Sequence, residues 1–357
     1  MAYTTINKST DYFNTKLYTG NATTDTAQTG VGFQPDWLWI KERGGTGANI
    51  LVDAVRGVSA SSTPFLKTNT NGVEVSNNTN DFIKSLDSDG FTLGADSYFT
   101  DVNKNSSTYV AWNWKANGAG SANTDGSINS TVSVNSIGGF SIVSWTGNQS
   151  ANTVGHGLGV VPSLIIVKSL ASADAWYVYH KKLGATKSLF LDLTNAESTS
   201  STYWNDTAPT SSVFSVNNNT GTNNTGGMIA YCFAEKKGFS KFGSYTGNGS
   251  TDGTFVYTGF KPAWIMYKAS SISAQSWLIH DNKRGNQGAN ANPQDLRLLA
   301  NATNAEADVD IDFLSNGFKP RAGDTHINNH GTTYIYMAFA EEPLVANVGA
   351  SIPATAR

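Results

Sequence analysis

Few side chains in this sequence have the types and spacing that catalysis or metal binding requires. The segment DTHINNH places Asp324, His326 and His330 close together. Two histidines four residues apart aim both rings at one metal when they lie on a helix, but the Asn- and Gly-rich surroundings predict a loop. We therefore expect no metal and no other cofactor, with Asp324, His326 and His330 as weak candidate ligands.

Two histidines and two arginines recur at regular positions. His180 and His280 each lie 12 residues after a lysine that ends an apolar run, and the same offset earlier in the chain gives Asp53. A residue that recurs at two equivalent positions but is replaced at the third is typical of a hydrogen-bonding group at a strand end rather than of a catalytic group. The segments DAVRG and DNKRG predict a turn with a local Asp–Arg pair, the alternative being an anion contact by Arg56 and Arg284.

The remaining reactive residues also favour structural roles. The segment DVDID puts three aspartates, at 308, 310 and 312, on one strand face, which predicts a solvated face, with a calcium site as the alternative. Cys232 lies in the apolar segment MIAYCFAE and predicts an inert buried thiol. The sequence has no nucleophile elbow, phosphate-binding glycine loop, dinucleotide fingerprint or zinc cysteine set. We expect no catalytic residues and no enzymatic activity.

The elements that position these residues occur in three copies. The segments LYTGN, SWTGN and SYTGN end at Asn21, Asn148 and Asn248. Prolines and lysines follow at fixed offsets, at Pro35, Pro162, Pro262, Lys41, Lys168 and Lys268. Successive landmarks are 127 and then 100 residues apart, whether measured between the glycines of the TGN segments or between the prolines. Equal offsets at separate landmarks predict a triplicated unit.

Each copy opens and closes with a strand of its own pattern. The opening strand, WLWI in the first copy, is apolar on both faces. It is therefore either central in a sandwich with a further layer outside, or packed on a neighbouring repeat through its second face. The closing strands have one apolar face in all three copies, formed by Val110, Trp112, Ile229, Tyr231, Ile335 and Met337.

These patterns predict an all-β fold of three tandem homologous β-sandwich or jelly-roll-like units of about 100 residues. We expect repeat 1 at residues 1–117, a flexible linker at 118–135, repeat 2 at 136–238, repeat 3 at 239–342 and an extended C-terminal tail at 343–357. Because no linker separates repeats 2 and 3, we expect them to pack as a rigid pair.

Composition excludes several classes of function. Charged residues make up 14% of the 357 residues, the net charge is −3, and basic residues cluster only in pairs, so we expect no nucleic-acid binding. A single cysteine allows no intrachain disulfide. The chain has no apolar run of membrane-spanning length and no recognisable signal peptide, so we expect no membrane insertion.

Longer segments carry a family resemblance. The repeated YTGN opening with its GF-x-P-x-W run, the segments DSDGFTLG and YVAWNWK, and the junction FAEKKGFSKFGSYTGNGS resemble a repeat family of virion or tail-region proteins of tailed bacteriophages, especially marine phages of cyanobacteria. The resemblance runs from Tyr12 to Glu342. It implies a virion protein that assembles in the host cytoplasm and leaves by lysis, and it implies no site residues.

We therefore expect a non-enzymatic structural protein on the virion surface, either a capsid decoration or a peripheral tail, baseplate or fibre component. Its expected partners are other virion proteins and further copies of itself, in a trimer or a larger homo-oligomer. The alternative is a tail adhesin that binds a host receptor or glycan. Weak candidates for stacking on sugar rings are Trp176, Trp204 and Trp277, which we expect to be exposed.

Overall fold

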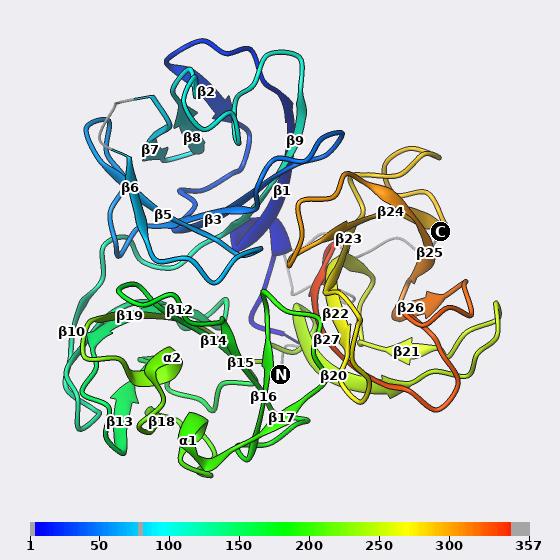
Figure 1. Cartoon of the computed structure of the whole chain (residues 1–357). Helices are drawn as coiled ribbons and strands as arrows, with labels where there is room; N and C mark the ends of the chain where they lie inside the picture. The colour runs from blue at the N-terminus through cyan, green and yellow to red at the C-terminus, as the bar shows by residue number, and fades with distance from the viewer. Residues whose placement is uncertain (1–3, 78–80, 344–357) are drawn as a thin grey trace.

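The chain folds into three β-units around a common centre (Figure 1). The computed structural model describes residues 4–77 and 81–343. We call residues 4–117 the first unit, 118–238 the second and 239–342 the third. The all-β prediction is confirmed, and the helical segments among the described residues are single turns: η1 (Ser9–Asp11), α1 (Ser201–Trp204) and α2 (Thr220–Asn223). In this part of the chain no helix has the length and apolarity to cross a bilayer. The predicted tail lies outside the described residues, apart from Pro343.

The strands divide among the units in chain order. The first unit contains β1 (Phe13–Thr19), β2 (Thr26–Thr29), β3 (Trp37–Glu42), β4 (Ile50–Asp53), β5 (Thr63–Lys67), β6 (Val75–Asn77), β7 (Ile83–Asp87), β8 (Gly90–Leu93) and β9 (Thr108–Trp114). The second contains β10 (Ser121–Asn123), β11 (Ser130–Asn135), β12 (Phe140–Thr146), β13 (Asn152–Gly155), β14 (Leu164–Ser169), β15 (Tyr177–His180), β16 (Lys187–Phe190), β17 (Ser198–Thr199), β18 (Val213–Val216) and β19 (Gly227–Phe233). The third contains β20 (Ser240–Thr246), β21 (Val256–Tyr257), β22 (Pro262–Ala269), β23 (Leu278–Asp281), β24 (Gln294–Leu299), β25 (Ala307–Leu314), β26 (Gly317–Pro320) and β27 (Thr333–Ala340).

The principal antiparallel sheets share one strand order. The five-strand series is β1-β9-β3-β4-β5 in the first unit, β12-β19-β14-β15-β16 in the second and β20-β27-β22-β23-β24 in the third. The opening strand therefore always pairs with the closing strand. The registers also agree, because Trp37, Leu164 and Trp264 lie opposite Trp114, Phe233 and Phe339, respectively. Positions that are equivalent in the sequence pattern thus occupy equivalent places in the three sheets.

Each unit has an apolar core of its own on one face of its sheet. In the first unit the small sheet β2-β8-β7 covers that face, and Phe82 and Phe91 pack against Leu38 and Ile40. In the second unit the strand pair β13-β18 covers the equivalent face of the sheet. In the third unit the sheet continues through β25, β26 and β21, and all eight of its strands contribute to one core, so the sheet curls into a nearly closed barrel.

The other face of each sheet packs into a core that all three units share. Its residues include Trp37, Trp39, Trp112, Trp114, Leu164, Ile166, Tyr231, Phe233, Trp264, Met266, Met337 and Phe339, which are at most 1% exposed. The opening strand is apolar on both faces because one face lines the core of its own unit and the other lines the shared core. Of the two explanations that the sequence left open, packing on neighbouring units is confirmed.

The predicted flexible linker at residues 118–135 is wrong. This segment forms β10 and β11, and β11 pairs with β12 along its whole length. Small polar residues suggested a linker, but Val132 is 4% exposed and packs in the core of the second unit. The second and third units are therefore not a separate pair, since the first unit is joined to both by the shared core.

Candidate functional site

The junctions between units contain several of the polar residues that the sequence singles out. A backbone hydrogen bond recurs at all three junctions. The amides of Glu74, Glu197 and Glu306 donate to the carbonyls of Leu170, Ser270 and Arg43, at 3.1, 2.9 and 2.8 Å. Each acceptor follows the recurring lysine by two residues. The first unit thus donates to the second, the second to the third and the third to the first, which closes a ring.

The recurring lysines Lys41, Lys168 and Lys268 are fully buried beside these bonds. The ammonium of Lys41 donates to the carbonyls of Glu42, Gly47 and Thr303, and the last of these belongs to the third unit. Lys268 likewise reaches Asn195 of the second unit at 3.0 Å. Burial lowers the pKa of each of the three lysines to about 8. Lys41 and Lys268 therefore hold loops of adjacent units through backbone oxygens, whereas Lys168 donates to the carbonyls of Ser169 and Ser172 in its own unit.

A second ring of contacts links the fourth strand of each five-strand series to the closing strand of the next unit. The Tyr231 hydroxyl donates to Asp53 at 2.8 Å, and the Trp112 indole N–H donates to Asp281 at 2.9 Å. At the remaining junction the ring of His180 pairs with the carbonyl of Tyr336 at 3.2 Å. Asp53, His180 and Asp281 lie at one register, opposite Trp37, Leu164 and Trp264. Three different pairs of groups thus join equivalent positions.

His280 does not share this position with Asp53 and His180. One additional residue between β22 and β23 puts Asp281 there instead, and His280 faces the core of the third unit. Its ring stacks on Tyr267 at 5.8 Å, and its Nε2 pairs with the carbonyl of Val309 at 2.8 Å. Burial lowers the pKa of His180 and of His280 to about 3, so both are neutral near pH 7. The predicted hydrogen-bonding role of both histidines is confirmed.

The two Asp-x-x-Arg-Gly turns form the predicted local pairs. Arg56 donates to Asp53 at 2.6 Å, and Arg284 donates to Asp281 at 2.7 Å. Each arginine also binds a carboxylate further along the chain: Arg56 contacts Glu74 at 3.2 Å and Arg284 contacts Glu306 at 2.9 Å. The arginine side chains are at most 4% exposed, so their contacts are made to carboxylates of the protein itself.

One family model spans this arrangement. It is described as a domain of unknown function (DUF7483), and it matches residues 8–343. The chain belongs to this family. The family domain therefore corresponds to the whole three-unit ring. No curated protein matched the chain, and neither did any solved structure.

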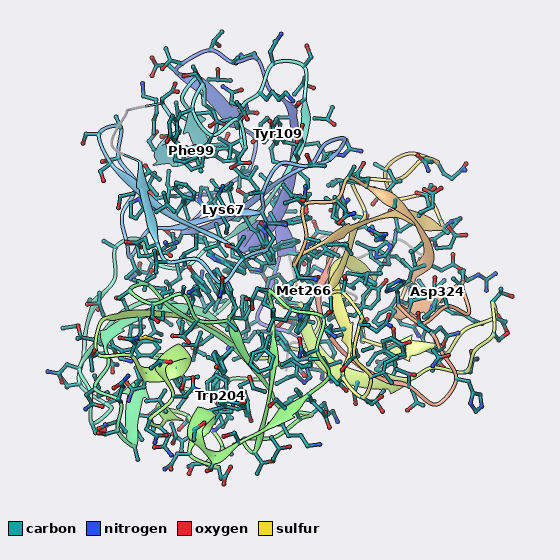
Figure 2. All side chains as sticks on the ribbon, in the orientation of Figure 1. Lys67, Phe99, Tyr109, Trp204, Met266 and Asp324 are labelled. Carbon is teal, nitrogen blue, oxygen red and sulfur yellow. The ribbon has the colours of Figure 1, made fainter. Side chains whose placement is uncertain are left out.

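The tryptophans proposed for stacking on sugars are buried in this DUF7483 domain. Trp176, Trp204 and Trp277 are 0%, 2% and 1% exposed, so the prediction that they are exposed aromatic platforms is wrong. Trp204 lies inside the second unit, whereas Met266 lies near the centre where the units meet (Figure 2). The indole N–H groups of Trp176 and Trp277 donate to the carbonyls of Thr70 and Phe190 in the preceding unit. Apolar residues follow Trp176 and Trp277 in the sequence, and this signal indicated burial, whereas the polar residues around Trp204 gave no such signal.

The weak metal-ligand candidates lie in a loop of the third unit, as the sequence predicted. Asp324 accepts a hydrogen bond from the backbone N–H of His326 at 2.9 Å, and His330 is exposed (Figure 2 labels Asp324). Within residues 4–77 and 81–343, no group of three or more His, Cys, Asp or Glu side chains could hold a metal ion. On β25 the three aspartates share one face, alternating with buried Val309, Ile311 and Phe313.

One predicted feature, the buried cysteine, and one that was not predicted, a pair of exposed aromatic side chains, lie elsewhere in the domain. Cys232 is buried, and burial raises the pKa of its thiol, which confirms the buried cysteine. Exposed aromatic side chains that were not predicted lie at the edge strand β21, where Phe255 is 45% and Tyr257 is 58% exposed. Val256 between them is buried, so the alternation in the segment TFVYT was a signal that could have found them.

Proposed function

We propose that this protein is a non-enzymatic structural protein on the surface of a tailed-phage virion. It decorates the capsid or forms a peripheral part of the tail, baseplate or fibre, and it acts through assembly with other virion proteins. We further propose that the three units arose by triplication of one β-domain. The shared strand order and the equal registers of Trp37, Leu164 and Trp264 support that origin.

The observation that carries the structural role is the use made of the recurring polar side chains. Lys41, Lys268 and the Asp53–His180–Asp281 positions all bond between units, as described above. Buried polar groups that form hydrogen bonds between units make a scaffold rigid. A rigid ring with neutral polar loops at its periphery suits a part that must keep its shape on a particle. We expect a trimer or a larger homo-oligomer.

The test is to locate the protein in purified particles. Phage particles from a host that produces this chain are banded by density, and peptide mass spectrometry measures its copy number relative to the major capsid protein. Gold-labelled antibody then distinguishes head from tail. A stoichiometric amount in intact particles supports the proposal. An abundant protein in the lysate that is missing from the particles would refute it.

A second candidate function, a tail adhesin that binds a host receptor or glycan, is favoured by Phe255 and Tyr257. Both side chains are exposed on either side of the buried Val256 of β21, and the paired strand β26 leads to Lys319 and Arg321, which pair with Asp252. The corresponding strands of the other units have Ala27 and Thr29, or Thr153 and Gly155. A glycan array compares Tyr257→Ala with Tyr98→Ala, because Tyr98 is 77% exposed in the first unit. Specific binding that only Tyr257→Ala abolishes would make adhesion the first function.

A further inference from the structure

The junction between the third and first units contains a cavity of 180 Å³. Its walls come from β1 and η1 of the first unit and from β22, the turn after β23 and the end of β27 in the third. Phe13, Ala263 and Ala340 form an apolar side, whereas Thr15, Asn282 and Glu342 form a polar side. The cavity thus has the mixed lining that is typical of a small-ligand site.

A residue difference between the units accounts for this cavity. Thr15, Ile142 and Phe242 occupy one register, opposite Trp112, Tyr231 and Met337 of the closing strands. Ile142 and Phe242 fill the shared core at this position. Thr15 has a shorter side chain, so the first unit leaves space where its counterparts are packed. Asn282, which follows Asp281 as Ala54 follows Asp53, adds a polar side chain where the first unit has a methyl group.

The polar wall has hydrogen-bonding capacity that the described residues do not use. The hydroxyl of Thr15 and the side-chain oxygen of Asn282 are buried and have no hydrogen-bond partner among these residues. The two side chains are 9% and 2% exposed. An unpaired polar atom buried in this way costs about 1–3 kcal/mol unless a ligand or water satisfies it. The smaller hollow of 130 Å³ between the second and third units has no such atom among its lining residues.

Charge and size narrow the class of ligand. Glu342 accepts a hydrogen bond from the backbone of Ser9 at 3.2 Å, and burial raises the pKa of its carboxyl. Glu341 pairs with Lys261 at 2.8 Å, and Lys283 is exposed. The wall is therefore rich in acceptors, with one basic side chain available. A cavity of about 150 Å³ holds a six-membered ring, so a ring that carries hydroxyl groups matches both the volume and the unpaired acceptors.

We propose that this junction cavity binds a single neutral sugar residue. Hydroxyl groups donate to Thr15, Asn282 and Glu342, and the C–H face of the ring packs on Phe13, Ala263 and Ala340. The site goes beyond the structural role and does not depend on it, because binding is measured on the purified full chain without particles. It is also separate from the exposed aromatic strand β21.

The test uses saturation-transfer NMR and calorimetric titration of the full chain with methyl glycosides of the common hexoses and N-acetylhexosamines. Thr15→Ile introduces the residue found at the equivalent position of the second unit, and Asn282→Ala introduces that of the first. We expect saturable binding by the wild type, at least a tenfold loss in both variants, and unchanged binding by Tyr257→Ala. Lys283→Ala, an exposed change at the cavity, serves if either core-facing variant misfolds, and we expect it to weaken binding two- to fivefold.

Thermal melting completes the design. Thr15→Ile should melt at or above the wild-type temperature, because it fills the cavity and removes an unpaired hydroxyl. Absence of saturable binding to the whole glycoside panel would overturn the proposal, and so would wild-type affinity in a folded Thr15→Ile variant. In either case the cavity holds water only, and the proposed place of the protein in the virion is unaffected.

Discussion

Removing the Asp281 carboxylate tests how the ring holds together. Asp281 accepts hydrogen bonds from Trp112 of the first unit at 2.9 Å and from Arg284 at 2.7 Å, and all three side chains are at most 1% exposed. Asp281→Ala leaves a buried guanidinium with Glu306 as its remaining carboxylate and leaves the indole N–H without its acceptor. Breaking one member of a buried pair of this kind costs about 3–5 kcal/mol.

Denaturant unfolding followed by tryptophan fluorescence and by circular dichroism measures this loss. A chain of 357 residues has an unfolding entropy of about 0.75 kcal/mol/K at about 2.1 cal/mol/K per residue. A loss of about 4 kcal/mol therefore lowers the melting temperature by about 5 °C. We expect both probes to shift together, since Trp112 and Trp264 lie in the core that all units share.

Asp252→Ala is the matched control. Asp252 also pairs with two basic side chains, Lys319 and Arg321, but its side chain is 75% exposed, and exposed pairs contribute about 0–1 kcal/mol. Equal losses from Asp281→Ala and Asp252→Ala would refute the reasoning. So would an early transition confined to one probe, because it would mean that the third unit unfolds by itself.

Three other changes give further predictions. His180 and His280 stay neutral down to about pH 3 in the folded protein but bind protons near pH 6.5 when the chain is unfolded. The free energy of unfolding therefore falls as the pH drops below 6.5, by about 3 kcal/mol per histidine at pH 4.5. Denaturant titrations at pH 7 and pH 4.5 measure this loss, and His180→Gln should remove about half of it. Lys268 has a folded pKa of about 8 against 10.5 in the unfolded chain, so its contribution to stability becomes more favourable as pH rises from 8 to 10, and Lys268→Met should flatten that rise. Gly247→Ala should destabilise by about 1–3 kcal/mol, because the added Cβ clashes with the backbone oxygen of Asn329, whereas Gly44→Ala, with its nearest contact at 3.9 Å, should cost less than about 1 kcal/mol.

The strands of the principal sheets could be predicted because the spacing of apolar residues that marks a strand lies within a few neighbouring residues. Proline, the apolar run and lysine recur at fixed offsets, and period two in the closing strands identified one core-facing side. The two-faced opening strand left contact between copies as one of two explanations. The closed ring could not be predicted from the sequence, because it depends on which loop of one unit contacts which strand of the next. Those residues are far apart in the chain.

The mistaken predictions have identifiable physical causes. Residues 118–135 are small and polar on one side of β11, which concealed the buried Val132 and suggested a linker. The burial of Trp176 and Trp277 depends on contacts with the preceding unit, which the local sequence does not show. Asn49 occupies the position of Trp176 and Trp277 in the first unit and donates across the same kind of junction, to the carbonyl of Ala302 at 2.9 Å. Side-chain type alone does not reveal that such a position faces a neighbouring unit.

Cooperativity of unfolding tests the shared core most directly. Burial of each tryptophan of that core removes about 150–250 Å² from water, which contributes about 4–6 kcal/mol. Detaching one unit would expose several of these rings, and the free-energy cost would exceed a net stability of about 5–15 kcal/mol. Differential scanning calorimetry of the full chain compares the calorimetric enthalpy with the van't Hoff enthalpy. The ring described here predicts one transition with a ratio near one, and separate transitions with a ratio approaching three would contradict it.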